Sequence, residues 1–463
     1  MADPDLQEAA SALDADDRLT GAFVAQVIAA LDDGDNEAAR ALAEPLHPAD
    51  IADLFEQVPA HDRAGLAAAL GDKLDAEVFA EMNEWVKSEL LDLLDAGQVA
   101  EIAQALDTDD AVAILEDMDA GDAQDVLRAM TPEDRAAIEE ALSYPEESAG
   151  RLMQRDLVAV PEDWTVAQVT AFLHERPDLQ TDFWEIFVVD EGMLPVGTMR
   201  LSWLLTTPPD IAVADLMQRD QTLIPVDMDQ EEVALRFQKY ALISAAVVDL
   251  KGRLVGVITV DDIVHIIQEE AGEDILKLSG AGDGDINEPV FDTYKTRSRW
   301  LIVNLGTAMV SSSVIAAFAP TIEKFVVLAA LTPIVASVGG NAGTQTMAVA
   351  VRALATNQLT EANTRRTIWR ELRVAAANGL TVATLMGIGT ALVFQNPMLG
   401  GVIAAAMLFN ILVAGMAGVI VPVLLDRFNF DPAVSSSVFV TMTTDTMGFL
   451  GFLWLATRAG LTG

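Results

Sequence analysis

The strongest constraint on the fold of this 463-residue chain is a series of long apolar segments in its last third. Five such runs follow one another, and each is near the roughly 20 residues that a helix needs to cross a bilayer. Helices satisfy their own backbone hydrogen bonds in lipid, so the pattern predicts an α-helical membrane domain. The five predicted spans are residues 300–319, 325–350, 372–394, 399–425 and 433–456.

The second apolar run contains an unusual group of glycine and amide residues, read as PIVASVGGNAGTQ from Pro333 to Gln345. Such residues suit a lipid-facing helix poorly, and loosened backbone at membrane depth is tolerated only inside protein or beside water. One interpretation is close packing of small residues with interhelical hydrogen bonds. The other is the lining of a pore. Both predict an interface or a pore on the side formed by Gly339, Gly340, Asn341, Gly343 and Gln345.

Asp445 is the only carboxylate that lies deep inside a predicted span. An ionisable group in hydrocarbon costs at least about 2.5–3.5 kcal/mol on insertion scales, so it is a functional candidate by default. The alternative is a structural hydrogen bond to a neighbouring helix.

Charge is divided sharply along the chain. Up to Tyr294 there are 65 acidic and 17 basic residues, and after it 6 and 11, giving net charges of −48 and +5. An acidic field attracts cations and repels nucleic acid, so no nucleic-acid partner is expected. The same composition is also typical of a protein from a salt-rich cytoplasm. Basic residues between the spans predict cytoplasmic soluble domains and an external C-terminus in the cell (inner) membrane.

Residues 1–150 are predicted to form an acidic helical domain. Apolar residues recur at helical spacing, and capping signals interrupt them roughly every dozen residues, which favours a stack of short helices. Asp109 and Asp110 stand in the first turn of one such helix. Their simplest role is to complement the helix dipole. The alternative is to share a cation with a neighbouring acidic domain.

Residues 151–260 contain a tandem repeat. The sequence LMQRD beginning at Leu152 recurs from Leu216, and each copy is predicted as strand, helix, strand, strand, helix. The copies, about residues 151–210 and 211–260, resemble a pair of CBS domains. In the second copy the sequence GVITVDD from Gly256 resembles the CBS nucleotide signature. The first copy has Arg200 and Trp203 at the corresponding positions, so one adenine nucleotide per chain is expected.

Residues 261–290 are predicted to contain an amphipathic connecting helix followed by a break from Gly280 to Gly284. One side of this helix is densely acidic. Like charges at helical spacing repel by a few tenths of a kcal/mol per pair, which a bound divalent cation would reverse. The simpler interpretation is a solvated helix face. The acidic positions are Asp262, Glu270, Glu273 and Asp274.

The ordered motif P-x5-G-G-N-x-G-x-Q in the second span resembles the pore signature of the MgtE family of magnesium channels. The sequences LDTDDAVAILEDM and YPEESAGRLM resemble the N domain of that family, and D-x-x-G at Asp445 resembles its pore aspartate. The resemblance covers the whole chain. It implies a multidomain membrane protein with an all-α superhelical N domain, an α/β CBS pair, a connecting (plug) helix and a five-helix transmembrane domain (residues 291–463).

The resemblance also implies function. It predicts a homodimeric Mg²⁺ channel that is closed by cytoplasmic Mg²⁺. Asp445, Asn341 and backbone carbonyls around Gly339, Gly340 and Gly343 would form the pore. The regulatory cations would bind Asp262, Glu270, Glu273 and Asp274 with Asp109 and Asp110. His265 stands where a further carboxylate is expected, and Ala113 departs from the family's acidic pattern.

The resemblance to CBS domains implies that Thr259 contacts the phosphates of ATP or another adenine nucleotide, and that Asp262 contacts its ribose. Asp261 or Asp262 could instead cap the helix that follows, and Asp262 could serve the cation site instead. Two other functions stay open. One is a proton- or sodium-coupled divalent-cation carrier, and the other is a non-transporting membrane sensor. No nucleophile–base set or P-loop is present and there are no cysteines, so an enzyme is not expected.

Overall fold

The computed structural model describes residues 12–116, 118–176, 183–280, 286–360 and 362–460. The chain folds as two compact units, Met1–Gln268 and Glu269–Gly463, and helix α16 contributes to both. Each unit is described by itself.

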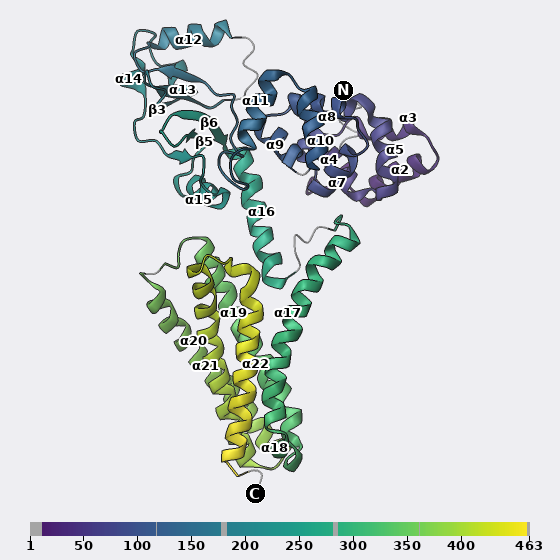
Figure 1. Cartoon of the computed structure of the whole chain (residues 1–463), viewed down its shortest axis with the longest axis vertical. Helices are drawn as coiled ribbons and strands as arrows, with labels where there is room; N and C mark the ends of the chain where they lie inside the picture. The colour runs from purple at the N-terminus through teal and green to yellow at the C-terminus, as the bar shows by residue number, and fades with distance from the viewer. Residues whose placement is uncertain (1–11, 117, 177–182, 281–285, 361, 461–463) are drawn as a thin grey trace. The chain divides into compact units, whose positions relative to one another are not determined.

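The first unit begins with a layer of short helices around one hydrophobic core (Figure 1). Polar residues cap many of their N-termini. Thr20, for example, accepts a hydrogen bond from the Phe23 amide, and Asp95 forms a capping box with Gln98. The helices are α2 (Gly21–Asp32), α3 (Asn36–Ala43), α4 (Pro48–Gln57), α5 (Ala60–Leu70), the 3₁₀ turn Gly71–Lys73, α6 (Ala76–Glu81), α7 (Glu84–Leu91), α8 (Ala96–Ala105), α9 (Thr108–Glu116), α10 (Ala120–Ala129) and α11 (Pro132–Ala141).

The repeated region forms two three-stranded sheets with the same topology, in which the first two strands are parallel and the last two antiparallel. The order predicted for each copy is therefore present. Small helices join the strands. The elements are β1 (Ala159–Pro161), α12 (Val166–Glu175), β2 (Glu185–Val189), β3 (Pro195–Arg200), α13 (Leu201–Thr206), α14 (Val213–Leu216), β4 (Leu223–Pro225), α15 (Gln230–Tyr240), β5 (Ser244–Val248) and β6 (Leu254–Thr259).

The repeated LMQRD sequence joins the two copies. Gln154 pairs with Val257 of the second copy, and Gln218 pairs with Thr198 of the first. The glycine next to each contact has no room for a side chain, because a Cβ at Gly256 would lie 2.9 Å from the Gln154 carbonyl oxygen. Each copy of the repeated sequence therefore pairs with a strand of the other copy, and these two equivalent contacts hold the copies together as one module.

Helix α16 (Val260–Ser279) follows β6 directly. Its start is amphipathic as predicted, since Ile263 and Ile266 are buried in the core of the second repeat. In the second half Ile275 is 69% exposed, whereas Leu278 packs on the cluster that contains Met347 and Val440, so the predicted apolar side is only partly covered there. Apart from Gly280, the predicted break from Gly280 to Gly284 lies outside the described residues.

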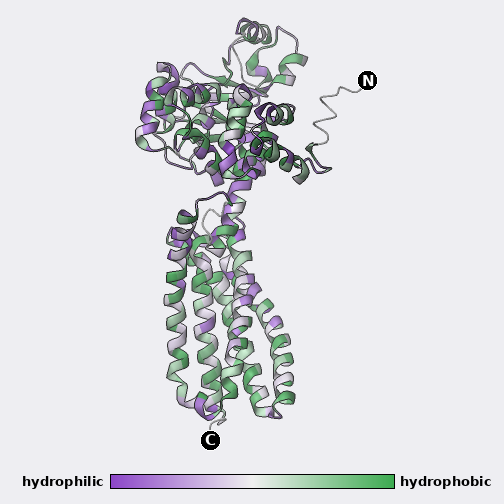
Figure 2. Ribbon diagram, turned by 90° about the vertical axis from the view of Figure 1, so that its right-hand side faces the viewer, coloured by the Kyte–Doolittle hydropathy of each residue, from purple (hydrophilic) through white to green (hydrophobic). Residues whose placement is uncertain are grey.

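The second unit is a helical bundle whose long helices are composed mostly of hydrophobic residues (Figure 2). Five of its helices within the described residues are long and apolar enough to cross a membrane. Each extends beyond the predicted apolar run at one end at least, whereas α17 ends two residues before the predicted end at 319 and α19 begins two residues after the predicted start at 325. The short helix α18 was not predicted. The bundle consists of α17 (Val290–Ala317), α18 (Ala319–Lys324), α19 (Val327–Ala355), α20 (Thr364–Val393), α21 (Pro397–Arg427) and α22 (Pro432–Arg458).

Candidate functional site

The glycine-rich motif lies within one uninterrupted helix, α19, and its residues fall on two faces. Gly339 and Gly343 are buried against α21 and α22, where a Cβ at Gly343 would lie 2.7 Å from Val440 and 3.3 Å from Thr444. The backbone of α19 is therefore not opened by the glycines, which instead permit close helix packing. A Cβ at Gly340 would meet nothing within 4 Å, and Asn341 is exposed.

The exposed face of α19 is polar, although it lies in the middle of an apolar helix. Asn341, Thr344 and Gln345 are all exposed in this chain, and the Thr344 hydroxyl donates a 3.0 Å hydrogen bond to the Gly340 carbonyl. Polar residues are unfavourable against lipid tails. We therefore expect this face to contact water, an ion or another protein surface rather than lipid.

Asp445 is partly buried on α22, and the surrounding contacts hold the helix without using its carboxylate. Thr444 packs on Gly343, and the hydroxyls of Thr446 and Ser311 lie 3.0 Å apart, which ties α22 to α17. Within the described residues the Asp445 carboxylate has no hydrogen bond and no ion pair. It is thus a positioned carboxyl group that remains available to a further group.

A cavity of about 430 Å³ lies on the N-terminal side of Asp445, between α17 and α22. Ser437 and Thr441 line it, and they precede Asp445 at four-residue helical spacing, which places the three on one side of α22. Arg297 and Trp300 stand on the α17 side. The lining residues are Ser279, Gly280, Arg297, Trp300, Leu301, Asn304, Val434, Ser437, Val438 and Thr441.

In the first unit, two predicted carboxylates come together where α9 meets the start of α16. Burial, and then the charge of Asp262, raise the pKa of Asp109 well above its ordinary value. Burial likewise raises the pKa of Asp262 to about 6, against a hydrogen bond from Thr259 and with repulsion from Asp261 and Asp110. One carboxylate oxygen of Asp109 is buried without a hydrogen-bond partner. Burial is therefore the first cause of the raised pKa of both carboxyl groups.

Further acids extend this cluster. Burial raises the pKa of Asp110, while Lys87 and His265 act in the opposite direction. Burial also raises the pKa of Asp107, with smaller contributions from Asp156 and Asp261. His265 stands where a carboxylate was expected, and its electrostatic effect lowers the pKa of Asp110 where a carboxylate would raise it.

The two nucleotide-signature residues of the second repeat contact each other. The Thr259 hydroxyl lies 2.8 Å from Asp262 and also contacts Asp261, and Gln154 donates to Asp262 at 3.2 Å. In the first repeat the Arg200 guanidinium lies over the Trp203 ring at 5.6 Å and 3.8 Å from Glu185. The first repeat thus has a cation and an aromatic ring where the second has a hydroxyl and a carboxylate.

The remaining acidic positions lie in the second unit. Lys277 forms ion pairs with Glu273 and, at 3.2 Å, with Asp431, the residue that caps α22. Burial alone would lower the pKa of Lys277, but these two carboxylates raise it overall. Burial and Asp431 raise the pKa of Asp274. Glu270 is partly buried on the same helix.

No set of three or more acidic or histidine side chains in the described part of the chain converges closely enough to hold a metal ion.

Three polar residues that the sequence prediction missed are prominent in the structure. Asn410 is fully buried in α21, Glu371 is 7% exposed in α20 beside Arg370, and Lys277 bridges two acidic residues. Asn410 could have been found, because it is the only amide, hydroxyl or charged side chain in the run 399–425. Glu371 was missed because the predicted third span began one residue after it.

Comparison with known proteins identifies the family. The profile of the divalent cation transporter domain of MgtE matches residues 332–455, that of the MgtE intracellular N domain matches 46–147, and that of the CBS domain matches 213–269. The magnesium transporter MgtE of Thermus thermophilus is 33% identical over 437 residues, which cover 92% of this chain and 96% of that protein. This chain belongs to the MgtE family.

Other MgtE proteins agree over similar lengths. The magnesium transporter MgtE of Bacillus subtilis is 29% identical and covers 94% of this chain and 97% of its own. A crystal structure of the cytosolic domain of the Mg²⁺ channel MgtE in complex with ATP covers 52% of this chain and 99% of its own, with 32% identity and a TM-score of 0.48. The predicted MgtE resemblance and fold class are confirmed.

Proposed function

We propose that this chain is a homodimeric Mg²⁺ channel that mediates magnesium uptake and is closed by cytoplasmic Mg²⁺. The observation that carries the proposal is the Asp445 carboxylate, which is held inside a membrane-spanning helix with no partner in the described residues. A fixed anion at this depth is costly unless it serves a cation. The names of the MgtE relatives support Mg²⁺ as that cation.

Selection of a hydrated ion follows from the chemistry of this site. Mg²⁺ gives up its inner-sphere waters reluctantly and usually keeps several of them. We therefore propose that Asp445 binds Mg²⁺ through water, with the Asn341 side chain offering neutral oxygen. The backbone carbonyls expected from the sequence are not offered, because α19 stays helical and the Gly340 carbonyl accepts from the Thr344 hydroxyl. Gly339 and Gly343 would contribute by allowing the close packing that sets the width of the path.

Closure by cytoplasmic Mg²⁺ is proposed from the two acidic clusters. Buried carboxylates such as Asp109 and Asp262 repel each other when both are ionised, and a divalent cation between them would remove this repulsion. The same holds for Glu273 and Asp274 on α16, and Glu270 is the remaining candidate there. Because a ligand shifts a conformational equilibrium only by its differential affinity, Mg²⁺ must bind the closed arrangement more tightly.

Adenine-nucleotide binding at the second repeat is a separate proposal. The hydroxyl of Thr259 and the carboxylate of Asp262 lie together at the start of α16, and the CBS resemblance implies that they would contact phosphate and ribose respectively. If ATP binds there, a calorimetric titration of the purified chain should detect it, and Thr259→Ala should weaken it. Heat no greater than that of dilution in the wild type would contradict the proposal.

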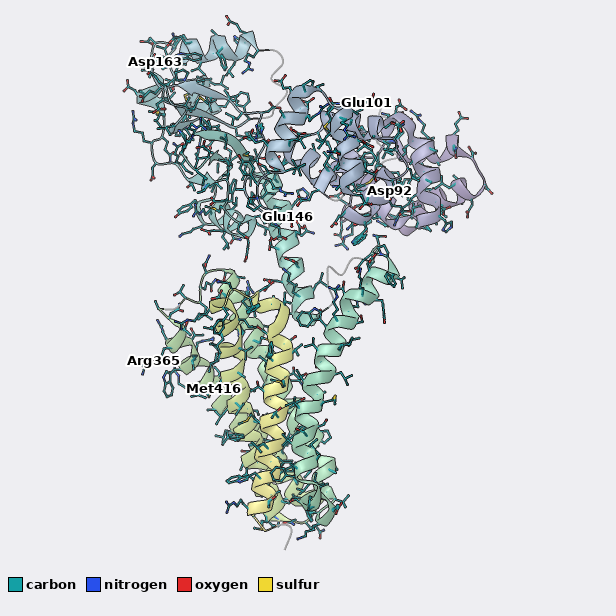
Figure 3. The ribbon with its side chains drawn as sticks, in the orientation of Figure 1. Asp92, Glu101, Glu146, Asp163, Arg365 and Met416 are labelled. Carbon is teal, nitrogen blue, oxygen red and sulfur yellow. The ribbon has the colours of Figure 1, made fainter. Side chains whose placement is uncertain are left out.

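Orientation in the cell (inner) membrane is proposed from the positive-inside rule. Arg365 at the N-terminal end of α20 (Figure 3) belongs to a basic cluster that includes Arg366, Arg370 and Arg373. These residues favour cytoplasmic soluble domains. The native chain has no cysteine, so labelling of single introduced cysteines with an impermeant thiol reagent would test the assignment.

The proposed function is tested by Mg²⁺ entry into proteoliposomes that contain a Mg²⁺-sensitive dye, with equal pH and equal Na⁺ on both sides. The wild type should admit Mg²⁺, and Asp445→Ala and Asp445→Asn should reduce entry to the leak of empty vesicles. Asp426→Asn is a matched control, because Asp426 is exposed in the last turn of α21. It should retain wild-type entry.

Each alternative has its own outcome. Entry that requires a pH or Na⁺ gradient would favour a coupled carrier. No entry in the wild type would favour a non-transporting sensor. Equal entry in the wild type and Asp445→Ala would contradict the assignment of Asp445.

A further inference from the structure

We propose that Asn410 of α21 is a positioning residue for the ion path. Its amide is clasped between Gly339 of α19 and Gly448 of α22, and it thereby sets the spacing of the helices that carry Asn341 and Asp445. This contact is called the Asn410 clasp. The inference rests on the proposed function, since it names a residue that positions the same path.

The geometry of the clasp is unusually close. Asn410 is 0% exposed, and its Nδ2 donates a 2.9 Å hydrogen bond to the Val335 carbonyl of α19. A Cβ placed on Gly339 would overlap this nitrogen, and a Cβ on Gly448 would lie 2.6 Å from it. The amide therefore fills the volume of the absent side chain on both neighbouring helices. Any other residue at either glycine would force the helices apart or displace the amide.

The clasp lies beside both candidate pore residues. Gly339 is in the same helical turn as Asn341, and Gly448 is one turn after Asp445. A second close contact occurs one turn further along α19, where a Cβ on Gly418 of α21 would lie 2.8 Å from the Gly343 carbonyl oxygen. Helix α19 is thus fixed at two successive turns, while its opposite face carries the exposed Asn341.

The chemistry of the side chain argues against simple space filling. The Asn410 Oδ1 is buried without a hydrogen-bond partner in the described residues, and an unsatisfied buried polar group costs about 1–3 kcal/mol. An apolar side chain of similar volume would avoid this cost in a helix that is otherwise apolar. The hydrogen bond from Nδ2 to the Val335 carbonyl of α19 therefore explains why an amide stands at this position.

The test is a double-mutant cycle in full-length chain, read by Mg²⁺ entry, by the ratio of Mg²⁺ to Ca²⁺ entry, and by melting temperature in detergent. Asn410→Leu keeps the number and branching of the side-chain heavy atoms but removes the donor. It should lower Mg²⁺ entry about tenfold or more, since small misplacements of a site are costly. It should also lower the Mg²⁺ to Ca²⁺ ratio. Asn378→Leu is the matched control, because Asn378 is exposed on α20, and it should change neither quantity.

The cycle itself uses Gly339→Ala. This change should abolish Mg²⁺ entry when Asn410 is present, because the new methyl group meets the amide. In an Asn410→Ala background the same change should cost less than about twofold, since the obstructing group is gone. Equal damage in both backgrounds would overturn the clasp.

A purely structural role has a different signature. An Asn410→Leu chain that melts earlier but keeps wild-type entry and ion ratio would overturn the positioning role. A wild-type chain that carries no Mg²⁺ would instead contradict the proposed function. The melting temperature would then test the clasp. If the decreases in melting temperature caused by Gly339→Ala and Asn410→Ala simply add in the double mutant, the clasp is overturned.

Discussion

At the scale of single residues, two carboxyl groups in the first unit are buried where the charged form is unfavourable. Asp109 and Asp262 are desolvated, which raises the pKa of both, and the charge of Asp262 raises the pKa of Asp109 further. Groups of this kind usually mark a functional site. Ionisation of Asp262 above its pKa of about 6 opposes folding of this unit, and a bound divalent cation would offset that cost.

The pH dependence follows from the sign of the shift. The pKa of Asp262 is about 6 in the folded chain against 3.8 when unperturbed, so the folded state holds this proton more tightly. Stability from this group is complete below about pH 4, declines between pH 4 and 6, and is lost above pH 6. Without divalent cations, lowering the pH from about 7.5 to 5.5 should raise the melting temperature by a few degrees.

Asp262→Asn isolates this effect, because the amide keeps the shape and cannot ionise. The variant should melt at a higher temperature than the wild type at about pH 7.5 in a chelator, and should show a smaller gain on acidification. Asp163→Asn, in an exposed turn labelled in Figure 3, is the control and should behave like the wild type. A wild-type chain that loses stability on this acidification would contradict the electrostatic explanation.

At the scale of elements, the second half of α16 carries its own cation. Lys277 lies between Glu273 on the same helix and Asp431 at the start of α22. Leu278 packs beside this pair on the cluster that contains Met347 and Val440. A helix end with several carboxylates is therefore held to the bundle by a built-in ammonium group.

Lys277→Gln should make this junction depend on divalent cations. In a chelator the variant should melt a few degrees below the wild type, because Glu273, Asp274 and Asp431 then face one another without a positive charge. Saturating Mg²⁺ should recover most of the difference. Lys251→Gln, in an exposed turn, is the control. An equal deficit with and without Mg²⁺ would show that a divalent cation does not replace the ammonium group.

At the scale of the whole molecule, a single chain leaves parts of its membrane-spanning helices uncovered by protein. Only 6% of the apolar window of α17 is buried, against 44% for α21, and α19 exposes an amide-bearing face. Met416 on the outside of α21 (Figure 3) shows the ordinary lipid-facing pattern, whereas Asn341 does not. A homodimer would bury the polar face at a two-fold axis and bring two copies of Asp445 toward it.

The dimer predicts a specific result for mixed chains. When wild type and Asp445→Ala are produced in equal amounts, random pairing leaves about one quarter of the dimers with both carboxylates. If both are needed, Mg²⁺ entry should fall to about one quarter of the wild-type value rather than to one half. Chains with different tags, co-purified and quantified on blots, would verify the pairing. Entry at one half would contradict a pore shared by two subunits.

Several features could be predicted from the sequence because they depend on local patterns. The apolar runs predicted the membrane helices, although Glu371 shows that the third span was predicted to begin too late in the chain. The LMQRD repeat predicted two equivalent sheets, but not that Gln154 and Gln218 cross between them. Contacts between segments distant in the chain leave little trace in local pattern, so the interhelical role of Asn410 and the two partners of Lys277 were not foreseen.

The sequence by itself determined the class of the molecule: five spans, a repeated α/β module, an acidic helical region, and Asp445 as the anion at membrane depth. These follow from hydropathy, periodicity and the cost of burying charge, which act residue by residue. Only the tertiary structure decided how the residues of the glycine motif divide. Gly339 and Gly343 turn inward to pack, while Gly340 and Asn341 face outward, because Asn410, Val440 and Thr444 from two other helices occupy the space that the missing side chains leave.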